Sequence, residues 1–175
     1  IGHVFYKESD EDMIEKNHVA GLITGESVKD WFDKKDPVDF YTIKGLVETM
    51  LSSFAFNEDV RYELATERDG MHPGRTADIY VGEDVLGYVG QIHPSIAKDN
   101  DLKDTYVFEL SVDQIVETDK DAIGYTALNR YPGSSRDIAL LVDNTITHSE
   151  LVDVISENGG EWLQDIQLFD LYEGE

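Results

Sequence analysis

The last third of the chain, from Arg130 to Glu175, reads RYPGSSRDIALLVDNTITHSELVDVISENGGEWLQDIQLFDLYEGE. Apolar side chains occupy every second position from Ile138 to Val142. This alternation is typical of a strand with one buried face, because successive side chains of a strand point to opposite sides. The pattern therefore predicts a strand over residues 138–142.

A helix start follows directly. Thr147 and Glu150 form a T-x-x-E capping box, in which each side chain accepts a hydrogen bond from a backbone amide that the helix leaves unpaired. Apolar residues then recur on one face: Leu151, Val154 and Ile155. The pair Gly159-Gly160 predicts the end of this helix.

Alternation resumes over residues 163–172, so the stretch is predicted to fold as strand, helix, strand. A unit of this length is half of a split βαβ arrangement, the ferredoxin-like sandwich. In such a sandwich helices cover one face of the sheet and leave the other face open. We expect the second half of this truncated βαβ domain to lie outside the sequence.

The preceding residues predict a larger α+β unit. Strands are expected at 1–6, 18–25, 60–66, 77–81, 85–92 and 106–110, and helices at 39–54, 94–100 and 112–116. Strands outnumber helices and hairpins recur, which favours a mainly antiparallel sheet with flanking helices. Residues 119–129 serve as a linker, so the predicted domains are 1–128 and 129–175.

Three details of this unit lead to further expectations. The strand at 18–25 is apolar on both faces and is expected to be central in the sheet. Gly45 inside a helix is unfavourable, and a close approach by another element would explain it. Gly87 and Gly90 indicate a bulge or tight packing against a helix.

Composition excludes several classes of protein. The 175 residues carry 14 basic and 37 acidic side chains, a net charge of −23, which argues against broad binding of nucleic acid. With 41% hydrophobic residues the chain can bury a core, but no apolar run approaches the roughly 18 residues of a membrane span. Cysteine is absent, which excludes disulfides and fits a cytoplasmic protein.

Motifs for catalysis or metal binding are missing from the sequence. Neither a P-loop nor a G-x-G-x-x-G fingerprint occurs. The five histidines are scattered without the spacing of a metal site. We therefore predict no catalytic residue, no metal ligand and no cofactor within this chain.

Several blocks of sequence resemble one family. Their order and spacing match across nearly the whole chain: 37–41 with Lys44-Gly45, 72–77 (HPGRTA), 87–94 (GYVGQIHP), 130–132 (RYP), 136–140 (RDIAL) and 168–174 (LFDLYEG). Together they are similar to the β subunit of bacterial phenylalanyl-tRNA synthetase. The resemblance identifies residues 1–128 with its catalytic-like domain, related to class II synthetase cores, and residues 129–175 with the first half of its anticodon-binding domain.

The resemblance implies a function for the chain as a C-terminal fragment of that subunit. It would scaffold the catalytic α subunit of an α2β2 heterotetramer and bind the anticodon of tRNA(Phe). The family attaches phenylalanine to tRNA with ATP and Mg2+ in the cytoplasm, and its chemistry lies in the α subunit. The fragment alone is expected to be inactive, because it lacks the ATP-clamping arginines.

The resemblance also implies site residues. The family reads the first anticodon base with an Ala, an Asp and a Tyr, which fall on Ala139, Asp170 and Tyr172. Such a pocket is chemically sensible, because the ring can stack on a base, the carboxylate can accept from a base N–H, and alanine leaves room. Arg75 is a candidate contact to a subunit or to tRNA, or else an arginine paired with a local carboxylate.

Two further interpretations remain open at the level of sequence. The chain could be a non-catalytic acidic module that binds a basic protein. It could also be a regulatory domain for small molecules, because ferredoxin-like sandwiches serve many functions.

Overall fold

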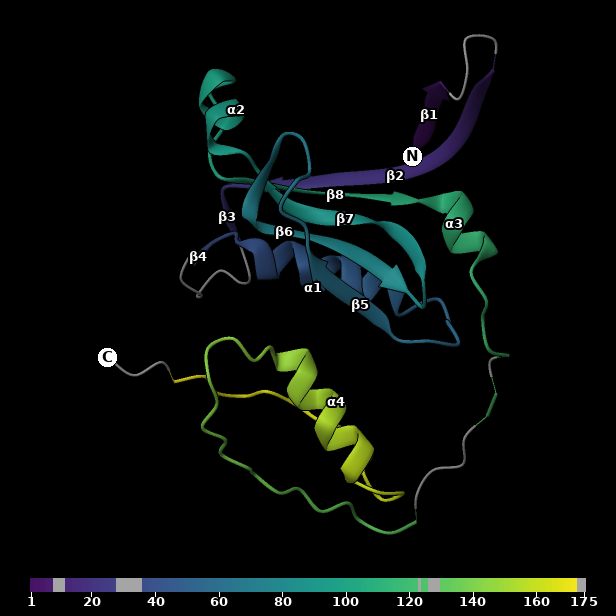
Figure 1. Ribbon diagram of the computed structural model, residues 1–175, viewed down its shortest axis with the longest axis vertical. Coiled ribbons are helices and arrows are strands. Elements are labelled where there is room, and N and C mark those ends of the chain that lie inside the picture. The colour runs from purple at the N-terminus through teal and green to yellow at the C-terminus, as the bar shows by residue number, and fades with distance from the viewer. Residues whose placement is uncertain (8–11, 28–35, 123, 126–129, 173–175) are drawn as a thin grey trace. The chain divides into compact units, whose positions relative to one another are not determined.

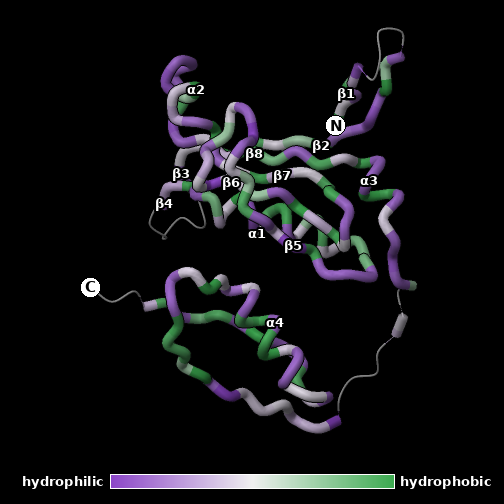
Figure 2. The backbone as a smooth tube through the Cα atoms, viewed as in Figure 1, coloured by the Kyte–Doolittle hydropathy of each residue, from purple (hydrophilic) through white to green (hydrophobic). Residues whose placement is uncertain are grey.

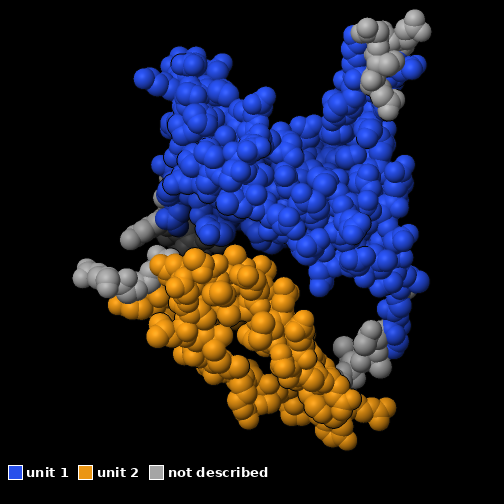
Figure 3. Space-filling view, viewed as in Figure 1, with its two compact units in different colours: residues 1–126 blue, residues 127–175 orange. Residues whose placement is uncertain are grey.

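The computed structural model describes residues 1–7, 12–27, 36–122, 124–125 and 130–172. The chain divides into two compact units, Ile1–Thr126 and Ala127–Glu175, which Figure 3 shows in different colours.

The first unit is built on a six-stranded antiparallel sheet with the strand order β1-β2-β8-β7-β6-β5 (Figure 1). Its strands are β1 (Gly2–Lys7), β2 (Met13–Thr24), β5 (Val60–Leu64), β6 (Met71–Val81), β7 (Asp84–Ile92) and β8 (Thr105–Ser111). A separate two-stranded pairing joins β3 (Glu26–Ser27) to β4 (Asp36–Pro37). The predicted α+β class with a mainly antiparallel sheet is confirmed.

Helix α1 (Phe40–Leu51) covers one face of this sheet and encloses the core. It begins where predicted, in a capping box: the Asp39 carboxylate accepts from the Thr42 backbone amide, and the Thr42 hydroxyl accepts from the Asp39 backbone amide. Its buried residues are Ile43, Val47 and Leu51, one on each successive turn. They pack on buried side chains of the sheet: Ala77, Ile79, Val81, Leu86, Val89, Tyr106 and Leu110.

The end of α1 differs from the prediction. The helix stops at Leu51, so Phe54 lies beyond it and is 37% exposed instead of completing the buried stripe. Two short helices follow later in the chain, α2 (Pro94–Asp99) and α3 (Val112–Glu117), both close to their predicted positions. Ile115 of α3 joins the same core as α1.

Gly45 corrects an expectation. No atom lies within 4 Å of where its Cβ would be, so no other element approaches it closely within the described residues. The glycine is therefore not required by packing inside this unit.

The glycines of β7 behave as expected in one respect and differently in another. The register shifts between Ile79 and Tyr80, which is the predicted bulge, and Gly87 adopts φ 155° beside it. A Cβ on Gly87 would lie 2.0 Å from the Glu109 carbonyl oxygen of β8. A Cβ on Gly90 would lie 2.5 Å from Thr76 Oγ1 of β6. The tight packing is thus between neighbouring strands and not against a helix.

The strand predicted to be central is β2, and it lies second from one edge of the sheet. Its burial alternates instead of being complete, and Leu22 is 65% exposed. The prediction of a strand buried on both faces is wrong, because only the side towards α1 is covered.

In the second unit the predicted helix forms. It is α4 (His148–Asn158), and its Thr147–Glu150 capping box is present as the sequence indicated. The helix ends at Gly159, against which Leu163 packs, and Gly160 follows with φ 70°. Both ends of this helix are therefore where the sequence predicts them.

The two strands predicted around α4 are not formed. Residues 138–142 and 163–172 run as extended segments without strand pairing; the first is largely apolar, and in the second apolar and polar residues alternate (Figure 2). The physical reason is that a strand needs ladder hydrogen bonds to a neighbour, and the two strands of a split βαβ unit are separated by a third strand that lies between them. Without that neighbour the backbone can be extended, as the alternating pattern predicts, but it forms no sheet.

Candidate functional site

The residues predicted to read the anticodon lie on the extended segments that flank α4. Ala139 precedes the helix, whereas Asp170 and Tyr172 follow it, and all three are exposed. Tyr172 is 88% exposed. No hydrogen bond, ion pair or ring contact joins these three residues in the described part of the chain. Residues 173 and 174, the end of the 168–174 block, lie outside the described residues.

A polar turn fixes the entrance of α4. The Asp143 carboxylate accepts from the Thr145 backbone amide at 3.0 Å and from the Thr145 hydroxyl at 2.8 Å, which lowers the pKa of Asp143. The Thr147 amide donates to the Glu150 carboxylate at 2.7 Å, and this bond lowers the pKa of Glu150. Both carboxylates are thus held ionised where the chain turns from the first extended segment into the helix.

Positive charge is scarce around these segments. From residue 130 onward the sequence holds two basic and ten acidic side chains. Arg136 folds back onto its own loop, where it donates to Ser134 Oγ and to the Ser135 carbonyl, both at 2.8 Å. The described part of this unit therefore offers little positive charge for neutralising phosphates.

Arg75 lies on β6 and is exposed. Its Nη1 donates to Gln91 Oε1 at 2.9 Å, and Gln91 Nε2 donates in turn to Asp104 Oδ1 at 3.1 Å. Gln91 is only 4% exposed, so the amide is a buried relay between the guanidinium and the carboxylate. Arg75 is thus anchored by one nitrogen through this relay.

A cavity of about 640 Å³ lies beside Arg75, where the N-terminal end of α1 leaves part of the sheet uncovered. Its lining includes the rings of Tyr41 and Tyr62 and the Lys44 ammonium, which lies 4.3 Å from the Tyr62 ring centroid. The Tyr62 hydroxyl is buried without a hydrogen-bond partner among the described residues. Burial, with a smaller contribution from Glu48, raises the pKa of Tyr62, so this hydroxyl stays protonated.

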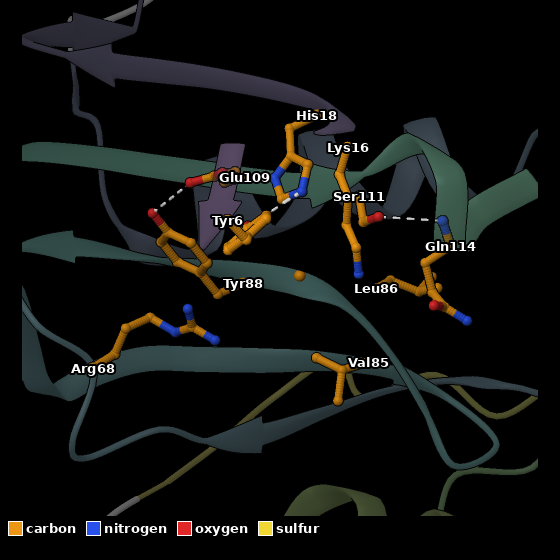
Figure 4. A pocket seen from close by; sticks show the side chains of 11 residues that line it. Tyr6, Lys16, His18, Arg68, Val85, Leu86, Tyr88, Glu109, Ser111 and Gln114 are labelled. Carbon is orange, nitrogen blue, oxygen red and sulfur yellow. Dashed lines mark hydrogen bonds and ion pairs between the residues drawn. The ribbon is translucent and has the colours of Figure 1, made fainter. Parts of the chain in front are cut away.

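A chain of polar contacts crosses the sheet on the face opposite α1 (Figure 4). His18 Nδ1 of β2 lies 2.7 Å from Glu109 Oε1 of β8, and the Tyr88 hydroxyl of β7 donates to Glu109 Oε2 at 3.1 Å. The register explains this meeting, because Tyr88 and Glu109 are directly paired across β7 and β8. Burial, followed by the Glu109 charge, raises the pKa of Tyr88.

Arg68 extends the chain of contacts towards β6. Its guanidinium lies 4.1 Å from the Tyr88 ring centroid, and its Nε and Nη2 donate to Asp78 Oδ1 at 3.0 and 2.6 Å. A cavity of about 260 Å³ opens above these residues, with Lys16 and Gln114 on its wall (Figure 4). No sequence pattern pointed to this cluster, because its members come from four strands and a loop whose register no local pattern shows.

No group of three or more His, Asp or Glu side chains could hold a metal ion among the described residues. No described helix is long and apolar enough to cross a membrane.

Comparison with known proteins defines the class. Residues 129–175 match the ferredoxin-fold anticodon binding domain, whose fold is the ferredoxin-like one that the alternation around α4 predicts. Residues 1–112 match the phenylalanyl-tRNA synthetase beta chain CLM domain. The chain belongs to the family of phenylalanyl-tRNA synthetase beta chains.

Relatives of high identity agree with this assignment. The chain is 45% identical over 177 residues to the phenylalanine–tRNA ligase beta subunit of Bacillus licheniformis, a match that covers 100% of the chain and 22% of the relative. Identity to the beta subunit of Latilactobacillus sakei is 46% over 175 residues, a match that covers 99% of the chain and 22% of the relative. The beta subunit of Bacillus subtilis is 42% identical over 177 residues, a match that covers 100% of the chain and 22% of the relative. The chain thus spans about a fifth of the length of the relatives it matches.

Proposed function

We propose that this chain is part of the β subunit of a phenylalanine–tRNA ligase, the enzyme that attaches phenylalanine to tRNA(Phe) at the expense of ATP. The observation that carries the proposal is the pair of family matches, which together account for residues 1–112 and 129–175 in the expected order. The competing interpretation, an acidic interaction module, is not favoured by these matches.

The first domain, residues 1–128, would serve as a scaffold. Its antiparallel sheet with one face covered by α1 fits a catalytic-like domain related to class II synthetase cores. Its partner would be the catalytic α subunit of an α2β2 heterotetramer. Arg75 and the aromatic cavity beside it, lined by Tyr41 and Tyr62, are the surface we assign to contact with a subunit or with tRNA.

The second domain, residues 129–175, would read the anticodon. When a neighbouring strand completes the sheet, strand parity would place Asp170 and Tyr172 on one face of their strand, with Ala139 beside them. The ring of Tyr172 would stack on the first anticodon base, the Asp170 carboxylate would accept from a base N–H, and Ala139 would leave room. The exposure of all three residues leaves them accessible to RNA.

The chemistry of the complex would lie elsewhere. ATP and Mg2+ are required by the reaction, and the residues that would clamp them belong to the α subunit in this proposal. The chain itself would supply binding and orientation of tRNA, in the cytoplasm, without a catalytic residue of its own.

Photochemical crosslinking tests the assignment of the two domains. The intact complex is mixed with tRNA(Phe) that carries a photoreactive guanosine analogue at the first anticodon position, and crosslinked peptides are mapped after irradiation. We expect crosslinks within residues 130–172. Crosslinks confined to residues 1–122 or to the α subunit would contradict the assignment.

Co-expression tests the scaffold. The chain, expressed with a catalytic α subunit, should co-elute with it in gel filtration. Separate elution of the two proteins would show that residues 1–128 do not supply the contact.

A further inference from the structure

The cavity on the sheet face opposite α1 has an unusual balance of hydrogen-bonding groups. Among the described residues, the only carboxylate in its lining is that of Glu109, and both Glu109 oxygens are already engaged, one with His18 and the other with the Tyr88 hydroxyl. Nearby Asp113 is engaged as well, because it accepts from the backbone amide and the side-chain amide of Asn17. The carboxylates around this cavity are therefore already engaged.

Donors, in contrast, remain open. Lys16 lies 5.9 Å from the Tyr6 ring centroid but has no ion-pair partner among the described residues, although acidic residues outnumber basic ones by 37 to 14 in the chain. Arg68 uses Nε and Nη2 on Asp78 and leaves Nη1 open. The Gln114 side-chain amide makes no hydrogen bond in the described part of the chain, and Ser111 Oγ accepts from the Gln114 backbone amide but donates to no described group. Figure 4 shows Lys16 and Gln114 on the wall of the cavity.

Open donors beside carboxylates that are already engaged are complementary to a ligand group that only accepts hydrogen bonds. Ionised carboxylates and phosphates are such groups, because they offer several lone pairs and no proton. Lys16 and Arg68 add positive charge, which favours an anion over a neutral carbonyl.

The remaining lining defines the body of the ligand. Val85 contributes apolar surface and Tyr6 contributes a ring, on the same cavity as the donors. The volume of about 260 Å³ corresponds to roughly nine waters at about 30 Å³ each, which suits a small molecule and not a polymer.

We propose that this cavity binds a small oxyanion, a phosphate or carboxylate that carries a short apolar or aromatic body. Lys16, Ser111 and Gln114 would hold the oxyanion, and Val85 and Tyr6 would contact the body. This site is separate from the proposed anticodon reader, which belongs to the second unit, and does not depend on it.

The test is a titration of the full 175-residue chain, labelled with 15N, followed by NMR in dilute buffer. The probes are phenyl phosphate, inorganic phosphate, benzoate and phenol. Phenyl phosphate should shift amide signals of β2, β7 and the start of α3 with a Kd of about 1 mM, as expected for a ligand of this size. Inorganic phosphate should bind more weakly at the same signals, and phenol should not bind. The comparison of phenyl phosphate with benzoate shows which oxyanion the donors prefer.

Lys16→Gln removes one charge at the site and should weaken phenyl phosphate binding about tenfold, the usual effect of losing a charge-assisted hydrogen bond. Lys98→Gln is the matched control, because it changes the net charge equally on α2, away from the cavity lining, and should leave the Kd unchanged. Gln114→Leu provides a second variant that removes a donor without altering charge, and it should weaken binding a few-fold.

Retention of the dispersed amide spectrum shows that each variant is folded. The proposal is overturned if phenyl phosphate at about 10 mM, roughly ten times the expected Kd, shifts no amide signal of a residue that lines the cavity. It is also overturned if Lys16→Gln and Lys98→Gln weaken binding equally, because the effect would then be that of net charge. Equal binding of phenol and phenyl phosphate would likewise exclude an oxyanion site.

Discussion

Two glycine-to-alanine substitutions in the first unit should have opposite effects on stability. Gly45 lies within α1, and nothing lies within 4 Å of where its Cβ would be. Gly87 lies in β7 with φ 155°, and its Cβ would lie 2.0 Å from the Glu109 carbonyl oxygen and 2.8 Å from Leu110 Cα. The same added methyl group therefore meets open space at one site and the backbone of β8 at the other.

The magnitudes follow from these surroundings. Gly45→Ala should raise the free energy of unfolding by about 1 kcal/mol, because alanine restricts the unfolded chain and favours the helix. For a unit of this size that corresponds to roughly 3–5 °C in Tm. Gly87→Ala must strain the backbone, at about 1–3 kcal/mol, and must also displace the adjacent strand. We expect a total loss above about 4 kcal/mol, much of the usual stability of a domain.

Thermal unfolding followed by circular dichroism, with the wild-type chain in parallel, measures both changes. Gly87→Ala should lack a cooperative transition near the wild-type Tm. The close packing assigned to β7 would be refuted if Gly87→Ala unfolded within about 2 °C of wild type, a difference worth well under 1 kcal/mol. A lower Tm for Gly45→Ala would show that an unrecognised contact requires this glycine.

Three further predictions concern α4 and the chemistry. Thr147→Ala removes the capping box and should destabilise α4 by about 1 kcal/mol. NMR chemical shifts of residues 148–158 should then report reduced helicity, and unchanged helicity there would contradict the prediction. Because the folded-state pKa of Glu150 lies below its ordinary value of 4.5, its contribution is present above pH 4.5 and is lost as the pH falls through the lowered pKa. Helix α4 should therefore lose helicity on acidification below that value, and Glu150→Gln should reduce this dependence, leaving the part that comes from Asp143. The pure chain should show no phenylalanine-dependent pyrophosphate exchange, and measurable exchange would contradict the proposal that catalysis lies in the α subunit.

Local structural features, such as helix caps and a β-bulge, were predictable from the sequence. The caps at Asp39 and Thr147 appear where the pattern placed them, since a cap depends only on residues three positions apart. The bulge near Gly87 was also predictable, because a glycine inside a strand weakens it and is usually found where the strand bulges or packs closely.

Features that depend on distant residues were not predictable. The strands expected at 138–142 and 163–172 lack a neighbour, and alternation reports a half-buried surface without reporting a partner. The relay from Arg75 through Gln91 to Asp104 joins residues 13 and 16 positions apart, so no spacing rule reveals it. The cluster of Glu109 with His18 likewise arises from sheet register alone.

The resemblance supplied what neither composition nor periodicity contained. A net charge of −23 argues against RNA binding, and only matched motifs around Ala139 and Tyr172 pointed to an anticodon. Those residue roles stay predictions.

The most direct test of the proposed function is the steady-state charging of tRNA(Phe) by an intact enzyme that carries Tyr172→Ala. Loss of one base–aromatic stack should cost about 1–3 kcal/mol, which is a 5- to 150-fold fall in kcat/KM for tRNA at about 1.4 kcal/mol per factor of ten. Phenylalanine activation should be unchanged, and Tyr172→Phe, which keeps the ring, should retain most of the charging rate. Wild-type charging by a correctly folded Tyr172→Ala enzyme would contradict the assignment of this tyrosine to the anticodon.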